Sequence, residues 1–196
     1  MKRRPARIQL VVAGILTLLL LAMTAVPTGA ADVKRGVNAE DLAFHLTNCL
    51  RTGGWVTKDG KCMAYGKGKF SKYVKPLRRS DKISNKVAWP WARKSVQFYG
   101  KSTCWIGHAR NGSTVKSRFR QAGLTARHGE NMGCGFYGPG ETVIRVIRMW
   151  QAERKYNGWH WRQVKDPEFR GVGVAVARYG KKVQFVLDLY EKKAVS

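Results

Sequence analysis

Acidic residues are scarce in this sequence of 196 residues: 12 aspartates and glutamates stand against 37 lysines and arginines, and the formal net charge is +25. Four of the basic residues and none of the acidic ones lie in the first thirty positions, so residues 31–196 carry 33 basic and 12 acidic residues, or about +21. A charge of this size attracts polyanions without needing a dedicated site. It equally suits a soluble surface that resists self-association, and composition alone does not separate the two.

Several motifs that mark enzymes and metal sites are also missing. The four histidines form no HExxH pair, the four cysteines form no CxxC pair, and no serine lies in a GxSxG segment. The glycine-rich stretches contain no Walker pattern, and the chain has no internal repeat or heptad. Motif searching alone therefore identifies no enzyme.

The N-terminal segment has the pattern of an export signal. Four basic residues precede an apolar run from Ile8 to Val26. We predict that residues 1–30 are a signal peptide and that the mature chain begins near Ala31 or Asp32. The alternative is an uncleaved anchor, because about twenty apolar residues can cross a bilayer. The expected location is extracellular, with membrane contact only through the signal peptide.

The remaining length suits a single domain, and its cysteines indicate an oxidising compartment. An even number of cysteines in an exported chain favours two disulfides over a thiol catalyst or a zinc site. Three pairings are possible. We predict Cys49 with Cys62, which closes a short glycine-rich loop, and Cys104 with Cys134, which joins two distant parts of the core.

Four segments have the apolar spacing of helices. Their predicted bounds are Asn38 to Gly53, a second helix from Ser80 or Asp81 that is kinked or interrupted at Pro90, a third capped by Ser113 and ending at Gly123, and a fourth from Glu141. Between the first two, residues 55–75 are rich in glycine and lysine, which predicts an exposed excursion or short hairpin.

The C-terminal part changes to a period of two. Residues 172–176 and 183–189 alternate apolar side chains around a turn at 179–181, which predicts a β-hairpin. Residues 129–135 are a candidate third strand. Helices on both sides of a small antiparallel sheet follow, so the predicted fold class is α+β.

Five short segments carry a family resemblance across residues 40–190. In chain order they are Gly107-His108 with residues 111–114 and Arg118, then Gly129-Glu130-Asn131, then residues 150–154, then His160 to Val164, and then Gly171 to Val174. Each is weak alone, but their order resembles that of the CAP superfamily (cysteine-rich secretory proteins, antigen 5 and pathogenesis-related proteins). The resemblance implies a three-layer α-β-α sandwich in one CAP domain, residues 31–196 with a core at about 38–191.

The resemblance further implies a cleft that gathers two histidines and two acids. These are His108, Glu130, Glu153 and His160. Imidazole nitrogens and carboxylate oxygens together suit a divalent ion such as zinc, so all four are predicted metal ligands. Glu130 and Glu153 are the candidate catalytic residues. The alternative is that the histidines are hydrogen-bonded residues that orient Glu130, with no ion bound.

Some residues near these segments depart from the family pattern or have a simpler explanation. Gly107 replaces the hydroxyl residue that often precedes the first histidine. His45 and His128 are predicted to be packing or surface residues. Tyr137 and Trp159 are candidates for the rim of the cleft or for packing.

Three functions stay open. The first is a secreted binding or effector module, not an enzyme, that engages a lipid, a wall polymer or another protein, because no nucleophile is evident. The second is a metal-dependent hydrolase in which His108, His160 and an acid hold the ion while Glu130 or Glu153 activates a water. The third is a cationic nucleic-acid binder, suggested by charge and by aromatic residues among lysines at 65–73, with no recognised nucleic-acid motif.

Overall fold

The computed structural model describes residues 33–191, so the predicted signal peptide and its cleavage site lie outside the described residues. None of the helices in this part combines the length and apolarity that crossing a bilayer requires. The elements in chain order are β1 (Val33–Arg35), α2 (Val37–Arg51), β2 (Trp55–Val56), β3 (Cys62–Met63), β4 (Arg78–Arg79), α3 (Asp81–Ile83), the π-helix η2 (Ser84–Ala88), α4 (Trp89–Ser95), α5 (Val115–Gln121), β5 (His128–Gly135), α6 (Pro139–Ala152), the 3-10 helix η3 (Glu153–Tyr156), α7 (Trp159–Lys165), β6 (Gly171–Tyr179) and β7 (Lys182–Tyr190).

The C-terminal hairpin of β6 and β7 forms the centre of the main sheet. Its strand order is β1-β6-β7-β5, all antiparallel, and the short β4 pairs in parallel with the start of β6. The predicted hairpin and the predicted third strand are therefore confirmed. β5 lies at one edge of this sheet, and that position matters for the site.

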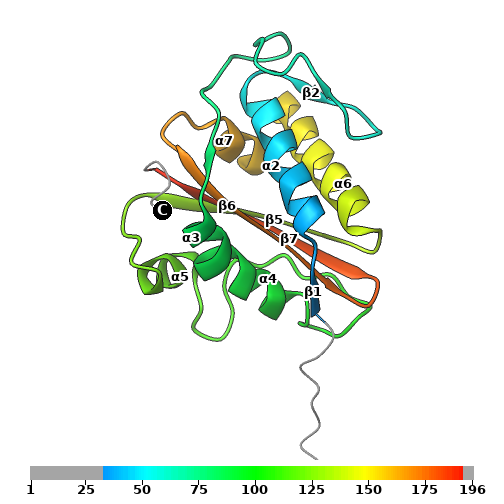
Figure 1. Ribbon diagram of the computed structural model, residues 1–196, viewed down its shortest axis with the longest axis vertical. Coiled ribbons are helices and arrows are strands. Elements are labelled where there is room, and N and C mark those ends of the chain that lie inside the picture. The colour runs from blue at the N-terminus through cyan, green and yellow to red at the C-terminus, as the bar shows by residue number, and fades with distance from the viewer. Residues whose placement is uncertain (1–32, 192–196) are drawn as a thin grey trace, which may run out of the picture. The chain divides into compact units, whose positions relative to one another are not determined.

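Helices cover both faces of the sheet, as Figure 1 shows. α2, α6 and α7 lie on one face, while α3, α4 and α5 lie on the other. This arrangement confirms the predicted α-β-α sandwich. The layers form because both faces of β6 and β7 are apolar: Val174 and Leu187 belong to the core under α2 and α6, whereas Ala175 and Val186 pack with Trp91 of α4.

The second predicted helix begins where expected, but its interruption has a specific form. Its turns run from α3 through η2 into α4, and Pro90 lies in the first turn of α4. Proline has no N–H to donate, and the wider π-helical turn just before it accommodates the missing hydrogen bond. The segment therefore stays helical overall.

The predicted cap of the third helix is wrong by one residue. Thr114, not Ser113, precedes the first turn of α5, and its hydroxyl accepts a hydrogen bond from the Ser117 N–H at 3.1 Å. The Ser117 hydroxyl in turn accepts from the Thr114 N–H at 2.8 Å. This reciprocal capping box fixes where α5 begins.

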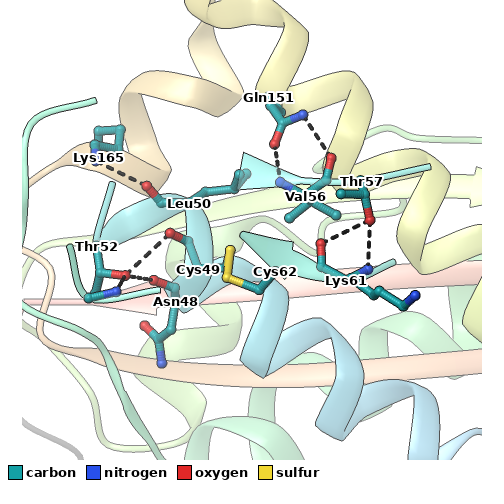
Figure 2. Close-up of a disulfide and its surroundings, with 11 residues drawn as sticks. Asn48, Cys49, Leu50, Thr52, Val56, Thr57, Lys61, Cys62, Gln151 and Lys165 are labelled. Atoms are coloured by element: carbon teal, nitrogen blue, oxygen red, sulfur yellow. Dashed lines mark hydrogen bonds between the residues drawn. A yellow bond between two sulfur atoms is a disulfide. The ribbon is translucent and has the colours of Figure 1, made fainter. Parts of the chain in front are cut away.

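Both predicted disulfides are confirmed. Cys104–Cys134 joins the loop after α4 to β5, and Cys49–Cys62 joins α2 to the small β2–β3 hairpin (Figure 2). Gln151 of α6 also binds this hairpin through two hydrogen bonds to Val56. Its side-chain oxygen accepts from the Val56 N–H at 2.7 Å, and its side-chain amide donates to the Val56 carbonyl at 3.1 Å. The start of the predicted excursion is thus attached firmly to the α2–α6 layer.

Candidate functional site

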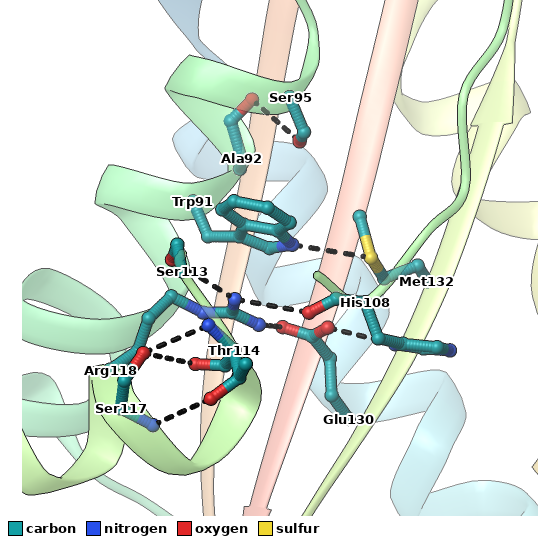
Figure 3. A network of polar contacts seen from close by, with 10 residues as sticks. All are labelled: Trp91, Ala92, Ser95, His108, Ser113, Thr114, Ser117, Arg118, Glu130 and Met132. Atoms are coloured by element: carbon teal, nitrogen blue, oxygen red, sulfur yellow. Dashed lines mark hydrogen bonds and ion pairs between the residues drawn. The ribbon is translucent and has the colours of Figure 1, made fainter. Parts of the chain in front are cut away.

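Glu130 of β5 is the centre of the first histidine–acid pair. Its Oε1 lies 2.8 Å from Nδ1 of His108, and its Oε2 accepts from a guanidinium nitrogen of Arg118 at 2.5 Å (Figure 3). The Glu130 side chain is fully buried, whereas 42% of the His108 side chain is exposed. A buried carboxylate is therefore held between a guanidinium and a half-exposed imidazole, which satisfies both of its oxygens.

Arg118 is placed by α5 and by a stack of side chains on one face of the sheet. Its guanidinium lies 4.0 Å from the ring centre of Trp91, and it also donates to the His108 carbonyl at 3.2 Å. The Trp91 N–H points to the sulfur of Met132 at 3.4 Å (Figure 3). Because Glu130 and Met132 are two residues apart on β5, both belong to the face that α4 and α5 cover.

Glu153 and His160 form the second pair. Oε1 of Glu153 lies 2.6 Å from Nδ1 of His160, and its Oε2 accepts from the main-chain N–H of Trp161 at 3.2 Å. The His160 ring stacks on Trp150, with 5.6 Å between the ring centres. The carboxylate thus lies at the first turn of α7, where its negative charge faces the N–H groups of the helix.

The turn between η3 and α7 brings this pair together. Asn157 adopts a left-handed conformation with φ 54°, which reverses the chain, and Gly158 follows. A Cβ on Gly158 would lie 2.6 Å from Oε2 of Glu153, so only glycine lets the start of α7 approach the carboxylate this closely. Sequence analysis identified both ends of the pair but not this turn.

The two pairs lie on opposite faces of the sheet beside edge strand β5. Glu130 points to the α4–α5 side, and its neighbour Asn131 points to the other side, where its amide donates to the His160 carbonyl at 3.1 Å. Among residues 33–191, no three His, Cys, Asp or Glu side chains form a group that could hold a metal ion. The structure therefore brings the four predicted residues together as two pairs joined through β5, and a ligand set of all four stays a prediction.

Each histidine uses Nδ1 to contact its carboxylate, and in the described part of the chain no residue hydrogen-bonds to either Nε2. The exposed fraction is 42% for the His108 side chain and 25% for that of His160. A carboxylate on one ring nitrogen fixes the orientation of the imidazole and leaves the other nitrogen for a ligand or an ion. The geometry therefore suits binding of a ligand or an ion by the Nε2 atoms of two oriented imidazoles.

Sequence analysis missed Asp188, which lies beside the first pair. It is fully buried in β7 directly opposite Glu130, and neither of its carboxylate oxygens has a hydrogen-bond partner within residues 33–191. Burial raises the pKa of Asp188 well above its ordinary value, the charge of Glu130 raises it further, and Arg118 lowers it. The sequence contains an indication of this residue. Asp188 is the one acid in β7, and the alternating apolar residues Val183, Phe185, Leu187 and Leu189 occupy the opposite face.

The two remaining histidines and Gly107 have packing roles. His45 stacks on Tyr65 with 5.4 Å between ring centres, and His128 stacks on Phe119 at 4.7 Å. A Cβ on Gly107 would lie 2.3 Å from the Trp105 ring, so the indole occupies the space that a larger residue before His108 would need.

The two candidate rim residues have different surroundings. Trp159 is 60% exposed and lines a hollow of about 370 Å³ together with Gly129, the residue before Glu130. Tyr137 instead lies under the guanidinium of Arg145, 3.9 Å from its ring centre.

Comparison with known proteins agrees with this architecture. The family model of the cysteine-rich secretory protein family (CAP) matches residues 46–189. The chain therefore belongs to the CAP family, whose members are generally extracellular. Two disulfides within one domain fit that setting.

The solved structures that resemble this chain have low sequence identity to it, and one of them has a TM-score above 0.5. NaASP2 with Zn2+ has a TM-score of 0.52 and 14% identity, covering 82% of this chain and 88% of that one. A cysteine-rich secretory protein from Staphylococcus aureus has a TM-score of 0.49 and 15% identity, covering 80% of this chain but 39% of that one. A manganese-bound Ancylostoma-secreted protein has a TM-score of 0.46 and 14% identity, covering 80% and 70%. A search of curated proteins found no match.

Proposed function

We propose that this CAP-domain protein is a secreted binding or effector module, and that its extracellular ligand, a lipid, a wall polymer or another protein, docks beside β5 at His108 and His160. One observation carries the proposal. All four carboxylate oxygens of Glu130 and Glu153 already contact donors of the protein, namely the two imidazoles, Arg118 and the Trp161 N–H. Both carboxylates are thus occupied in orienting protein groups, whereas both imidazoles keep a ring nitrogen for a ligand.

The absence of an activated nucleophile supports the same conclusion. Both disulfides are formed, and the described residues include no free cysteine. Neither histidine ring contacts a serine or threonine hydroxyl in residues 33–191, since each Nδ1 is on a carboxylate. Covalent catalysis of the serine or cysteine type therefore has no machinery at this site.

A binding experiment with defined probes tests the proposal. The wild type, a His108→Ala/His160→Ala variant and a His45→Ala control are compared for binding to anionic phospholipid vesicles and to purified wall polymer, and for cleavage of casein. We expect at least one probe whose affinity is about tenfold lower, or 1.4 kcal/mol weaker, for the double variant but unchanged for the His45→Ala control. We expect none of the three proteins to cleave casein. Histidine-independent binding to every probe, or cleavage that the double variant loses, would overturn it.

A second candidate, a metal-dependent hydrolase, is favoured by one feature of the pairs. Histidines that ligate metals usually donate their other ring nitrogen to a carboxylate, and both His108 and His160 contact one through Nδ1. The two Nε2 atoms would hold the ion, while Glu130 and Glu153 would orient the rings. A bound zinc ion supplies a water with a pKa of about 7. The fold is similar to that of NaASP2 with Zn2+.

Zinc titration calorimetry separates these two candidates. If the pairs hold zinc, the wild type binds it stoichiometrically, His108→Ala or His160→Ala abolishes binding, and Glu153→Gln weakens it about 10- to 100-fold. His45→Ala is the matched control, because His45 stacks on Tyr65 away from both pairs. Absence of stoichiometric binding, together with unchanged behaviour of the His108 variant, would remove the hydrolase.

A further inference from the structure

The end of the 55–75 excursion runs beside the segment that enters β6 (Figure 1). Cationic side chains line two hollows in this region. One hollow of about 390 Å³ is lined by Tyr73, Lys75, Pro76, Arg78 and Arg170. A second hollow of about 430 Å³ is lined by Lys72, Tyr73, Val74, Lys75, Lys165, Pro167 and Arg170. The two share Tyr73, Lys75 and Arg170, so they form one continuous groove, which we call the basic groove.

The charges of the basic groove are uncompensated. Its lining holds five cationic side chains and no acidic one: Lys72, Lys75, Arg78, Lys165 and Arg170. None of these five pairs with a carboxylate of residues 33–191, whereas Arg127 pairs with Asp166 and Arg145 with Glu141. The few acids of this chain thus neutralise other parts of the surface and leave this groove positive.

One wall of the groove is fixed from behind by two cations. Fully buried Arg51 donates to the Lys75 carbonyl at 2.6 Å, and Lys165 donates to the Lys72 carbonyl at 2.6 Å. Lys165 also donates to the Leu50 carbonyl at 3.0 Å (Figure 2). Arg51 also donates to the carbonyls of Val164, Asp166 and Phe169. The main-chain carbonyls of Lys72 and Lys75 therefore face the protein interior, where Lys165 and Arg51 hold them. The exposed side chains of the same residues point to solvent.

The cations behind the wall also raise the positive potential in the groove. Burial, and then the charge of Arg51, lower the pKa of Lys165 to about 8. The charge of Asp166 offsets part of the lowering of the pKa of Arg51, whereas no carboxylate opposes the lowering of the pKa of Lys165. An anion bound in the groove would offset it, so the site is electrostatically incomplete without a ligand.

We propose that the basic groove binds a linear, base-free polymer of phosphate groups, and that it is a second binding site, separate from the histidine pairs and beyond the function proposed above. The groove is concave and extends over two hollows, which suits a chain rather than a flat surface. Its cations come from two segments of the chain: Lys72, Lys75 and Arg78 precede α3, and Lys165 and Arg170 lie between the end of α7 and the start of β6. A linear phosphate polymer carries a charge at each unit along its length, so it can contact the cations of both segments at once.

The lining argues against recognition of bases. Sites for single-stranded nucleic acids stack successive bases on several aromatic side chains. Tyr73 is the single aromatic residue in the lining of the basic groove, and 47% of it is exposed. The alternation of aromatics and lysines at 65–73 therefore reaches the groove only at its last two residues, Lys72 and Tyr73.

A charge-matched pair of variants tests the proposal. Lys75→Gln/Arg78→Gln removes one lysine and one arginine from the groove, and Arg93→Gln/Lys94→Gln removes the same charges from the exposed face of α4. Binding of labelled short-chain inorganic polyphosphate is measured by fluorescence anisotropy over a range of salt concentrations. We expect the groove variant to lose affinity about tenfold, with a salt slope reduced by about one to two, and the α4 variant to change less than about threefold.

Three further comparisons keep the outcome decisive. Lys72→Gln/Lys75→Gln repeats the test on residues outside any strand, with circular dichroism as the folding control. Oligothymidylate and a heparin oligosaccharide of equal charge should bind the wild type more weakly than polyphosphate does. The His108→Ala/His160→Ala variant should bind polyphosphate with the affinity of the wild type. Equal losses in the groove and α4 variants, or tighter binding of oligothymidylate or heparin, would overturn the proposal without bearing on the histidine pairs.

Discussion

Asp188 lies directly opposite Glu130 across the ladder between β7 and β5, and both residues are buried. Glu130 has Arg118 and His108 as partners, whereas Asp188 has none among residues 33–191. Two buried carboxyl groups at this separation cannot both ionise at low cost. Burial, and then the charge of Glu130, therefore raise the pKa of Asp188 well above its ordinary value.

Asp188→Asn should change how stability depends on pH. In the unfolded chain Asp188 loses its proton near the ordinary pKa of 3.8, but in the folded protein burial and Glu130 keep the proton bound to a higher pH. Above pH 3.8 the folded state then holds more protons than the unfolded state. The contribution of Asp188 to the free energy of unfolding therefore falls as pH rises, until the raised pKa is passed. We expect the variant to gain stability relative to the wild type between about pH 4 and pH 7 in urea unfolding. Asp81→Asn, at an exposed position, is the control, and a pH-independent difference would contradict the prediction.

Arg118→Gln should strongly destabilise the protein. It leaves the buried Glu130 carboxylate without its guanidinium partner, and such losses cost about 3–5 kcal/mol. Arg120→Gln on the same helix removes an exposed arginine and should cost less than about 0.5 kcal/mol. Chemical denaturation of both variants measures the difference, and similar costs would show that the ion pair contributes little.

Removing either disulfide should lower stability by a similar amount. The Cys49–Cys62 and Cys104–Cys134 bridges close loops of 13 and 30 residues. Loop-closure entropy then gives a cost of about 3 kcal/mol for the first and about 3.5 kcal/mol for the second. Paired Cys→Ala variants, compared by guanidinium unfolding, test this, and a near-zero cost for the second would mean that the loop after α4 is held by other contacts.

Lys165→Met should remove a gain in stability at alkaline pH. The pKa of Lys165 is lowered from 10.5 to about 8, so between these values the unfolded chain binds a proton that the folded protein has lost. Stability of the wild type therefore rises across that interval, while the penalty for burying the charge is constant below pH 8. Unfolding measured from pH 7 to pH 10 should show the rise in the wild type and in an exposed Lys155→Met control, but not in Lys165→Met. Parallel curves would refute the assignment.

Periodicity predicted the elements of this fold well where apolar residues alone decide the structure. Residues 172–176 and 183–189 alternate, and they form the central hairpin. The start of α5 was misplaced because two adjacent hydroxyl residues, Ser113 and Thr114, can both cap a helix. The π-helical turn before Pro90 has no signature in sequence spacing.

The pairing within the candidate site could not be predicted, because it depends on which face of the sheet each of four segments, distant in sequence, packs against. His108 contacts Glu130 and His160 contacts Glu153, on opposite sides of the same strand. The resemblance supplied the four residues but not their partners. Asp188 was overlooked because a pattern search for chemistry favours clustered acids over a single acid inside an apolar strand.

The four carbonyl contacts of Arg51 have a consequence for how this chain can vary. One side chain from α2 joins the excursion at Lys75 to the end of α7, so a stretch without regular structure moves as part of the rigid body. Insertions between residues 72 and 78 would break this junction, whereas the turn at Gly66 has open space around it. Natural length variation in this excursion should therefore concentrate near Gly66 and spare the residues that follow Ser71.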